Sequence, residues 1–393
     1  FRNFRNSFAR KCQKSFILKG ENMNWEIIDD NTQQAKIKVI GVGGAGGNAV
    51  IHMMNHNIEG VEFICANTDS QALSNATGAT ILKLGITNGL GAGANPEIGR
   101  QAAERDRESI TELLQGSDMV FITAGMGGGT GTGAAPIIAS IAKEVGALAV
   151  AVVTKPFKLE GKTREKAAEG GIASLVEEVD SLITIPNQKL MEVLGLNVSM
   201  EEAFAKADDV LKGAVQGISD IIMKPGYINV DFNDVKTVMS EKGIAMMGTG
   251  ISSGKDRGSL AASEAIGSEL LEDINLRDAR GVLVNLSAKS PTLGDMDEVS
   301  KVIEAIVAED AQVIYGAVID DSLSDDELTV TVVATGVNQQ LPRVAVENSQ
   351  STVQLSPVGL DKDHTKSEDS VGTSSAEDMD ILDVPTFMRK QVD

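Results

Sequence analysis

A run of nine residues, Gly125 to Gly133, constrains the fold of this chain more than any other segment. It reads Gly-Met-Gly-Gly-Gly-Thr-Gly-Thr-Gly, follows a strand-like segment at 118–124 and opens a helix-like segment at 134–146. Backbone N–H groups of residues without side chains can converge on phosphate oxygens, and the N-terminus of the following helix adds partial positive charge. Because Gly and Thr alternate where a strand meets a helix, we interpret the run as a phosphate-binding loop rather than a merely flexible one.

An earlier glycine tract, Gly41 to Asn48, satisfies the GxGxxG pattern of dinucleotide-binding folds. Asp69 even follows at about the distance at which NAD-dependent enzymes place an acidic residue on the ribose. The tract is a weak signal alone, because any tight strand-to-helix turn uses glycine. An NAD-dependent enzyme would leave the run 125–133 unexplained, and the missing GK[ST] ending separates that run from P-loop enzymes.

Length and composition predict a soluble chain with two core-forming domains and a tail. Of its 393 residues 42% are apolar, and no apolar stretch reaches the roughly 18 residues that span a bilayer. The net charge of −21 argues against binding nucleic acid or inserting directly into a membrane, because phosphate surfaces would repel most of the molecule. Cys12 and Cys65 are too few for a disulfide scaffold and favour a reducing, cytoplasmic compartment.

The three histidines, His52, His56 and His364, do not have the spacing of a zinc site. His52 and His56 have the i, i+4 spacing of metal-binding helices, but the glutamate of HExxH and a third ligand are missing. We therefore expect no metal held by the protein's own side chains.

The first 22 residues are basic, begin at Phe1 and contain no acidic residue before Glu21. That composition is typical of an organelle transit peptide. Met23, however, is followed by an ordinary-looking start, so we favour a translated leader or vector-encoded sequence. Residues 1–35 are expected to be a flexible extension.

From residue 36 to residue 187 the chain alternates short β-branched segments with helical patterns, which is typical of a parallel sheet covered by helices. The strand-like segments are 36–42, 61–67, 79–84, 118–125, 147–156 and 181–187. Glycine-rich turns at their carboxyl ends predict that a ligand binds along one edge of the sheet.

A long helix is predicted from Ser199 to Lys224, with a capping box formed by Ser199 and Glu202 and a stop at Pro225-Gly226. Its apolar positions recur every three or four residues and are expected to be buried. They are Met200, Phe204, Ala207, Leu211, Ala214, Val215, Ile218 and Ile222.

Beyond this helix, four strand-like segments (245–250, 281–288, 311–319 and 327–337) and helices near 259–271 and 296–308 predict a second, smaller α/β domain. Residues 338–378 are polar and poor in aromatics, so they should form a disordered linker. The last segment, 379–393, regains apolar character within a charged frame, which is typical of a short binding peptide.

Several motifs of this chain resemble those of one known protein family. GGGTGTG at 127–133 is the hallmark phosphate loop of the tubulin and FtsZ superfamily, and the chain resembles bacterial FtsZ rather than eukaryotic tubulin. The resemblance also rests on NTDSQAL, GLGAGANPEIGR, VVTKPF, DSLITIPN, NVDFNDVKTVMS, RGVLVNLSA and the ending DVPTFMRKQ. It covers roughly 36–337 and resumes at the C-terminus. Ala45 stands where many relatives have glycine, which should be tolerated if the backbone there is helical.

The resemblance implies an α/β fold with six parts. A Rossmann-like GTPase domain with a parallel sheet spans 36–199, a long central helix spans 200–224, and a smaller α/β domain with a mixed four-stranded sheet spans 225–337. The extension 1–35, the linker 338–378 and the partner-binding peptide 379–393 complete the chain.

The resemblance also implies GTP and GDP as ligands, with Mg²⁺ held mainly through the nucleotide phosphates. The residues expected to contact the nucleotide are Gly44, Ala45, Gly46, Gly47, Asn48, Gly91, Ala92, Gly93, Ala94, Gly129, Thr130, Gly131, Glu160, Arg164, Asn187, Phe204 and Asp208. The chemistry agrees at the base, because Phe204 can stack on a purine and Asp208, one helical turn later, can accept from the N1–H and amino group of guanine. Without the family context, Phe204 could be a core residue and Asp208 a solvated charge.

Asn229, Asp231 and Asp234 belong to an acidic loop beyond the far end of the predicted long helix. From Phe204 to Lys224 that helix rises by about 30 Å, so one chain cannot bring the loop to its own nucleotide. By resemblance, Asp231 and Asp234 polarise the attacking water, Asn229 helps to position it, and a neighbouring molecule supplies all three. From spacing alone they would be interpreted as surface charges.

A contact of this kind is heterologous and generates an open filament. The family therefore implies a GTPase that polymerises head to tail with itself and forms the cytokinetic ring at the division site. A catalytically idle homologue is disfavoured because the glycine loop and the acidic loop are both intact. The segment Asp380 to Lys390 is expected to dock onto FtsA-like and ZipA-like membrane-tethering proteins through apolar anchors.

Overall fold

The computed structural model describes residues 35–56, 58, 60–85, 88–195, 198–241, 243–268 and 276–337. All of them lie within one compact unit, Phe1–Pro342. The predicted linker 338–378 and tail peptide 379–393 lie outside the described residues, as does the extension up to residue 34.

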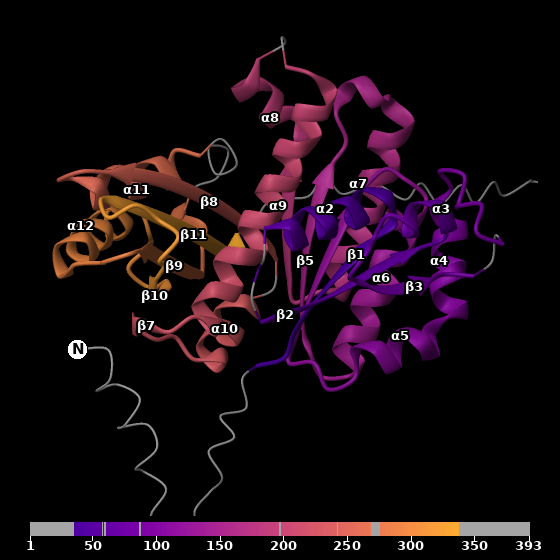
Figure 1. The fold of residues 1–393 in the computed structure, drawn as a ribbon, viewed down its shortest axis with the longest axis horizontal. Coiled ribbons are helices and arrows are strands. Elements are labelled where there is room, and N and C mark those ends of the chain that lie inside the picture. The colour runs from indigo at the N-terminus through magenta and orange to yellow at the C-terminus, as the bar shows by residue number, and fades with distance from the viewer. Residues whose placement is uncertain are drawn as a thin grey trace, which may run out of the picture. The chain divides into compact units, whose positions relative to one another are not determined.

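Eleven strands form one sheet among the described residues, in the order β3-β2-β1-β4-β5-β6-β8-β11-β9-β10-β7 (Figure 1). The strands are β1 Ile37–Val42, β2 Val61–Asn67, β3 Thr80–Lys83, β4 Met119–Gly125, β5 Leu148–Lys155, β6 Ser181–Pro186, β7 Gly226–Ile228, β8 Ile244–Ser253, β9 Gly281–Ala288, β10 Gln312–Ile319 and β11 Glu327–Val337.

The first six strands are parallel to one another and match the six segments predicted from the sequence. β4 and β5 are buried along almost their whole length. Such continuous apolar segments fit a sheet covered by helices on both faces. The carboxyl ends of β1, β2, β4, β5 and β6 therefore meet at one edge, as the glycine-rich turns predicted.

The helices cover the two faces of the sheet in separate layers. They are α2 Gly43–Asn55, α3 Ser70–Leu73, α4 Pro96–Arg105, α5 Arg107–Leu114, α6 Thr130–Glu144, α7 Lys162–Glu178, α8 Asn187–Leu194, α9 Met200–Met223, α10 Phe232–Met239, α11 Arg257–Ile266 and α12 Leu293–Glu304, with 3₁₀ turns at Lys158–Glu160 and Leu276–Asp278. One core contains the buried faces of α2, α9 and α10, and a second contains those of α4, α5, α6 and α7. A third lies between α11, α12 and the C-terminal strands.

The long helix α9 runs alongside the sheet and connects its two halves (Figure 1). The predicted capping box is present, because Ser199 Oγ accepts from the Glu202 N–H and the Glu202 carboxylate accepts from the Ser199 N–H. The α9 core also includes Met247, Leu283 and Val333 from the C-terminal strands, so both halves share apolar contacts.

Of the eight helix positions expected to be buried, two are exposed and one, Ile222, is only partly buried. Met200 is 62% exposed and Phe204 is 42% exposed, while Ala207, Leu211, Ala214, Val215 and Ile218 are buried as expected. The apolar periodicity continues through the first turn of α9, but that turn lies at the rim of a cavity instead of on the sheet.

The C-terminal half contains the four predicted strands and one that the sequence did not predict. β7 has only three residues, begins at Gly226 of the Pro225-Gly226 stop signal, and pairs antiparallel with β10. β8 pairs in parallel with β6, so the mixed C-terminal strands continue the parallel sheet. Helices α11 and α12 correspond to the two predicted near 259–271 and 296–308. Within the described residues, no helix is long and apolar enough to cross a membrane.

Candidate functional site

A cavity of about 640 Å³ opens at the carboxyl edge of the parallel strands, beside the N-terminal half of α9. Fourteen of the seventeen predicted nucleotide residues line it. These are Gly44, Ala45, Asn48, Gly91, Ala92, Ala94, Gly129, Thr130, Gly131, Glu160, Arg164, Asn187, Phe204 and Asp208. The fold thus brings residues more than 150 positions apart into one hollow.

The first glycine tract forms the turn from β1 into α2. Gly43 has φ +77°, a conformation that favours glycine, and a Cβ there would come within 2.9 Å of the Gly131 nitrogen. The two glycine segments therefore touch at the floor of the cavity. Ala45 lies within helix α2, which meets the condition under which alanine was expected to be tolerated.

The second glycine run joins β4 to α6 and forms the other side of this floor. Helix α6 begins at Thr130 after Gly129, and no side chain caps its first N–H groups. Unpaired N–H groups and the positive end of the helix dipole suit a phosphate. Thr130 Oγ1 lies 2.7 Å from Thr68 Oγ1, and Thr132 Oγ1 accepts from the Gly127 N–H at 2.8 Å, so the loop is braced from two directions.

The loop after β3 closes against this run. A Cβ on Gly129 would lie 2.8 Å from the Ala92 side chain and 2.9 Å from the Asn95 nitrogen. Gly91 and Ala94 have positive φ values of +82° and +58°. Backbone alone can approach a ligand here, because the segment presents small residues in left-handed conformations.

Glu160 and Arg164 stand at the rim of the cavity and form an ion pair, with Arg164 Nη1 2.6 Å from Glu160 Oε2. Glu160 also accepts from the Phe157 N–H at 2.9 Å. The Arg164 side chain is 52% exposed. Because the Arg164 guanidinium is exposed at the rim, it can also reach an anionic ligand in the cavity.

The opposite end of the cavity is built for a flat ring. Phe204 is half-exposed and meets Phe157 edge-on at 5.4 Å between ring centroids. Asn187 is buried, and its Oδ1 has no hydrogen-bond partner among the described residues. Burial raises the pKa of Asp208 to about 6, with His52 opposing the shift. An acceptor and a desolvated carboxylate therefore face this space beside an aromatic ring.

Three predicted residues, Gly46, Gly47 and Gly93, do not line the cavity. Gly46 is a packing position, since a Cβ there would come within 2.3 Å of the Thr123 oxygen on β4. At Gly47, the next residue of α2, a Cβ would meet no atom within 4 Å.

Sequence reasoning missed several residues that line the cavity, among them Asn67, Asp69 and Thr154. Asn67 and Thr154 are buried at the carboxyl ends of β2 and β5. Asp69 had been considered only as a ribose ligand of an NAD enzyme. In the structure it caps α3, accepting from the Gln71 N–H at 2.8 Å. The sequence signal that could have identified these residues is their position at, or just beyond, the carboxyl ends of predicted strands.

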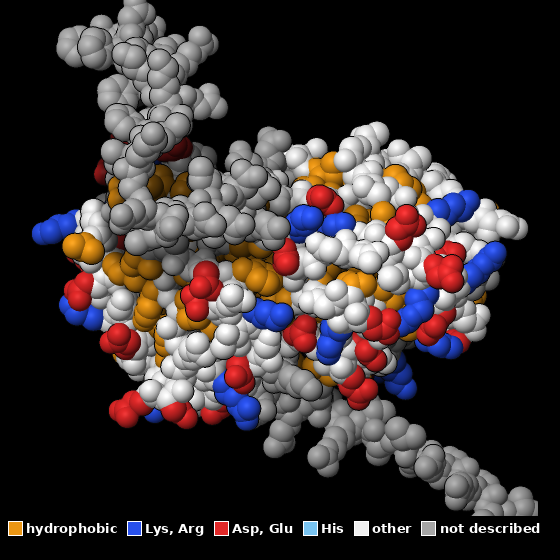
Figure 2. Space-filling model, turned by 90° about the horizontal axis from the view of Figure 1, so that it is seen from below, with side chains coloured by type: hydrophobic (Ala, Val, Ile, Leu, Met, Phe, Trp, Pro, Cys, Tyr) orange, Lys and Arg blue, Asp and Glu red, His pale blue; other side chains and the backbone are white. Residues whose placement is uncertain are grey.

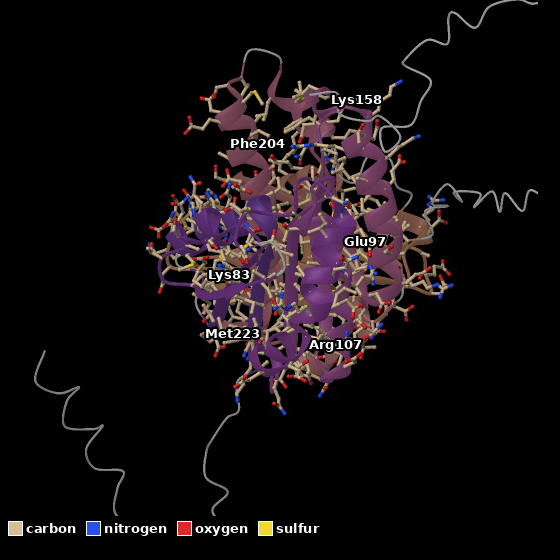
Figure 3. The ribbon with its side chains drawn as sticks, turned by 90° about the vertical axis from the view of Figure 1, so that its right-hand side faces the viewer. Lys83, Glu97, Arg107, Lys158, Phe204 and Met223 are labelled. Atoms are coloured by element: carbon tan, nitrogen blue, oxygen red, sulfur yellow. The ribbon has the colours of Figure 1, made fainter. Side chains whose placement is uncertain are left out.

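Asn229, Asp231 and Asp234 are exposed at the far end of α9 and do not line the cavity. Figure 3 labels Phe204 near one end of α9 and Met223 at the other, and α10 with its preceding loop lies beyond Met223. Asp231 Oδ1 accepts from the Asp234 N–H at 2.9 Å as the cap of α10, and Asn229 Oδ1 accepts from the Gly226 N–H at 2.9 Å. The chain therefore holds the acidic loop about 30 Å from its own cavity.

In a comparison with known proteins, each half of the chain matches a protein-family model. Residues 36–195 match the family described as "Tubulin/FtsZ family, GTPase domain", and residues 243–338 match "FtsZ family, C-terminal domain".

Curated relatives agree. The cell division protein FtsZ of Pseudomonas aeruginosa is 55% identical over 94% of this chain and 100% of its own length. That of Coxiella burnetii is 53% identical over 93% of this chain and 99% of its own length. The solved structure of an empty FtsZ dimer from M. jannaschii is 43% identical, covers 77% of this chain and 89% of its own, and superposes with a TM-score of 0.74. This chain belongs to the FtsZ family, whose N-terminal half is a tubulin-like GTPase domain.

Proposed function

We propose that this protein is a cell-division GTPase that polymerises head to tail and hydrolyses GTP where two subunits meet. The observation that carries the proposal is the separation of the nucleotide cavity from the acidic loop along α9. The cavity contains the residues that would bind a nucleotide. The loop contains Asp231 and Asp234, the carboxylates that would act on the attacking water.

Within the cavity, the floor formed by Gly43 and the run 125–133 suits the phosphates, and the end formed by Asn187, Phe204 and Asp208 suits the base. Guanine offers two adjacent donors, N1–H and the amino group, to a carboxylate. Adenine offers no such pair, so Asp208 favours GTP over ATP.

Mg²⁺ fits this cavity only together with the phosphates. Its carboxylates are already engaged or belong to the base end, since Asp69 caps α3 and Glu160 pairs with Arg164. Among the described residues, no group of three potential metal ligands lies in the cavity. When bound, the ion would neutralise charge on the phosphates, whose oxygens would supply most of its ligands.

Both ends of the molecule carry exposed apolar side chains next to the proposed functional groups. Leu90 is 88% exposed beside Gly91, and Leu159 is 60% exposed beside Glu160. At the other end Tyr227 is 71% exposed just before Asn229. Figure 2 views the end that carries α10 and β7 and shows apolar side chains grouped among charged ones. Two different ends that each expose apolar surface support a heterologous, open-ended contact.

In such a contact the acidic loop of one subunit covers the nucleotide of the next. Asp231 and Asp234 lie on one helical turn, so both carboxylates can face a water molecule near the γ-phosphate, and Asn229 can help to position that water. Hydrolysis then requires assembly, and loss of the γ-phosphate weakens the contact.

The variant Asp234→Ala tests this division of labour. We expect it to bind GTP as the wild type does and to lose most GTP turnover, since Asp234 does not line its own cavity. Asp231→Ala should behave likewise, although it also loses the α10 cap. Loss of GTP binding by isolated Asp234→Ala subunits would contradict the shared site.

We also propose that filaments gather as a ring at the division site, held there by membrane-tethering proteins that bind Asp380 to Lys390. This segment lies outside the described residues, and its apolar anchors and family resemblance support the proposal. Deleting residues 380–393 should leave GTP turnover intact and abolish binding to an FtsA-like or ZipA-like adaptor. Undiminished adaptor binding would assign the tail another role.

A further inference from the structure

His52, His56 and Asp209 form a cluster that the proposed GTPase activity does not use. One ring nitrogen of each histidine and one carboxylate oxygen of Asp209 lie within 4.8 Å of one another. None of the three lines the nucleotide cavity. The sequence pattern indicated the two histidines but no third ligand. Asp209, 157 residues after His52, becomes the third potential ligand because α2 packs against α9 (Figure 1).

We propose that this cluster binds a transition-metal dication of the Zn²⁺ class and thereby links α2 to α9. Two imidazoles and one carboxylate are ligands that suit Zn²⁺, whereas Mg²⁺ and Ca²⁺ prefer oxygen ligands alone. The site needs no nucleotide and is independent of the proposed function.

The hydrogen bonds in the cluster prepare the histidines for a metal. His56 Nδ1 lies 2.8 Å from the His52 carbonyl oxygen. A carbonyl only accepts, so Nδ1 carries the proton and Nε2 of His56 is left as the unprotonated nitrogen. Donation of the other ring N–H to a carbonyl is the usual arrangement of a metal-ligating histidine. His52 Nε2 lies 2.9 Å from Asp209 Oδ1. A metal bound at Nε2 would take the place of the proton between them, and the neutral His52 ring would then carry its proton on Nδ1.

The distances require only small adjustments. Ligand atoms about 2.1 Å from a tetrahedral zinc ion lie about 3.4 Å apart. The His52–Asp209 pair must therefore open slightly, and the His56 ring must move closer. His56 is exposed, so its ring has room to shift, while the other two side chains are partly exposed, 25% for His52 and 41% for Asp209. Lys212 Nζ is 3.7 Å from the same Asp209 oxygen, too far to occupy the carboxylate fully.

A metal bound at this cluster would connect two helices that both reach the nucleotide cavity. Helix α2 begins with the glycine turn at the cavity floor, and α9 carries Phe204 and Asp208 at the base end. A metal held by both helices would fix the distance between the two ends of the cavity, and it should raise the temperature of unfolding.

The test uses the full chain, freed of nucleotide, in a phosphate-free buffer with millimolar Mg²⁺ to occupy the many surface carboxylates. Zn²⁺ binding is measured by competition with a chromogenic chelator, and thermal unfolding is followed with and without Zn²⁺. We expect one Zn²⁺ per chain in the wild type. His56→Asn and, independently, Asp209→Asn should each weaken binding at least tenfold, since even indirect partners of metal ligands contribute 10- to 100-fold.

His364→Asn is the matched control, because it removes the remaining histidine of the chain from a segment far along the sequence. It should bind Zn²⁺ and gain thermal stability as the wild type does. If the two cluster variants bind Zn²⁺ as tightly as the wild type, the metal sits on surface carboxylates and the proposal is wrong. Loss of binding in His364→Asn alone would also overturn it.

Discussion

Asp208 and Asp209 are neighbours on α9 whose carboxyl groups have opposite surroundings. Burial beside the cavity raises the pKa of Asp208 to about 6. Burial also acts to raise the pKa of Asp209, but the His52 hydrogen bond and the nearby Lys212 outweigh it and hold that pKa below its usual range. The first carboxylate thus lacks a strong partner, which a guanine base would provide, and the second already has partners on α2 and α9.

Replacing Asp208 with Asn tests the guanine contact. The amide keeps the shape but presents one acceptor and one donor to two guanine donors, which leaves one of them poorly paired. We expect GTP binding to weaken by about 1 to 3 kcal/mol, roughly 5- to 150-fold, with little change for ATP. Equal affinity of the wild-type protein for GTP and ATP would contradict the base assignment.

Gly46 and Gly47 are adjacent on α2, but only Gly46 is packed closely against a neighbouring strand. An alanine at 46 would press its Cβ to within 2.3 Å of the Thr123 oxygen, whereas a Cβ at 47 meets nothing within 4 Å. Gly46→Ala should lower the free energy of unfolding by about 1 to 3 kcal/mol. Gly47→Ala should raise it by about 0.5 to 1 kcal/mol, because a helical glycine is replaced. Chemical denaturation of both variants measures the contrast, and equal stabilities would refute this view of Gly46.

At the scale of elements, the strands were predictable because buried parallel strands have short β-branched sequences bounded by glycine-rich turns. β7 could not be predicted, since three residues carry no periodicity. The exposure of Met200 and Phe204 was missed because helical periodicity does not reveal where a helix extends past its sheet. Motifs pointed to fourteen of the residues that line the cavity. Asp209, in contrast, joins His52 and His56 only through the packing of α2 on α9.

The C-terminal half contains a buried ion pair that holds α11 to α12. Arg257 donates through Nε and Nη2 to both oxygens of Asp295, at 2.9 and 2.7 Å. Burial acts to raise the pKa of Asp295, but hydrogen bonds from Arg257 and Thr292 outweigh it and hold the pKa below its usual range. A depressed carboxyl pKa contributes stability that is fully present above about pH 4 and is lost as the pH falls through the folded-state value.

Asp295→Asn should therefore be much less stable than the wild type at pH 7, by about 3 to 5 kcal/mol, because the buried guanidinium loses its carboxylate partner and keeps only the carbonyl oxygens of Ser290 and Asp325. The difference in free energy of unfolding should shrink as the pH falls below 4, where the wild type also loses the charge. Urea unfolding of both proteins across this range measures it. A gap that stays constant down to pH 2 would show that the charge of Asp295 is not what stabilises the pair.

At the scale of the whole molecule, the length of α9 is the feature on which the proposed shared site rests. It joins the two halves of the sheet, carries Phe204 and Asp208, which we propose recognise the base, near its start, and ends before the acidic loop. A rigid helix keeps these groups about 30 Å apart in each subunit. Stacking subunits in one direction brings each loop onto the next cavity without any change of fold, and every added subunit creates one further complete site.

The most direct test of the shared site is GTP turnover per molecule measured over a range of protein concentrations, with light scattering recorded on the same samples. We predict negligible turnover below a threshold concentration and a rise that coincides with the onset of scattering, since Asp231 and Asp234 of an isolated subunit lie about 30 Å from its own cavity. Turnover per molecule that stays constant on dilution below the onset of scattering would show that one chain hydrolyses GTP alone, and would contradict the account.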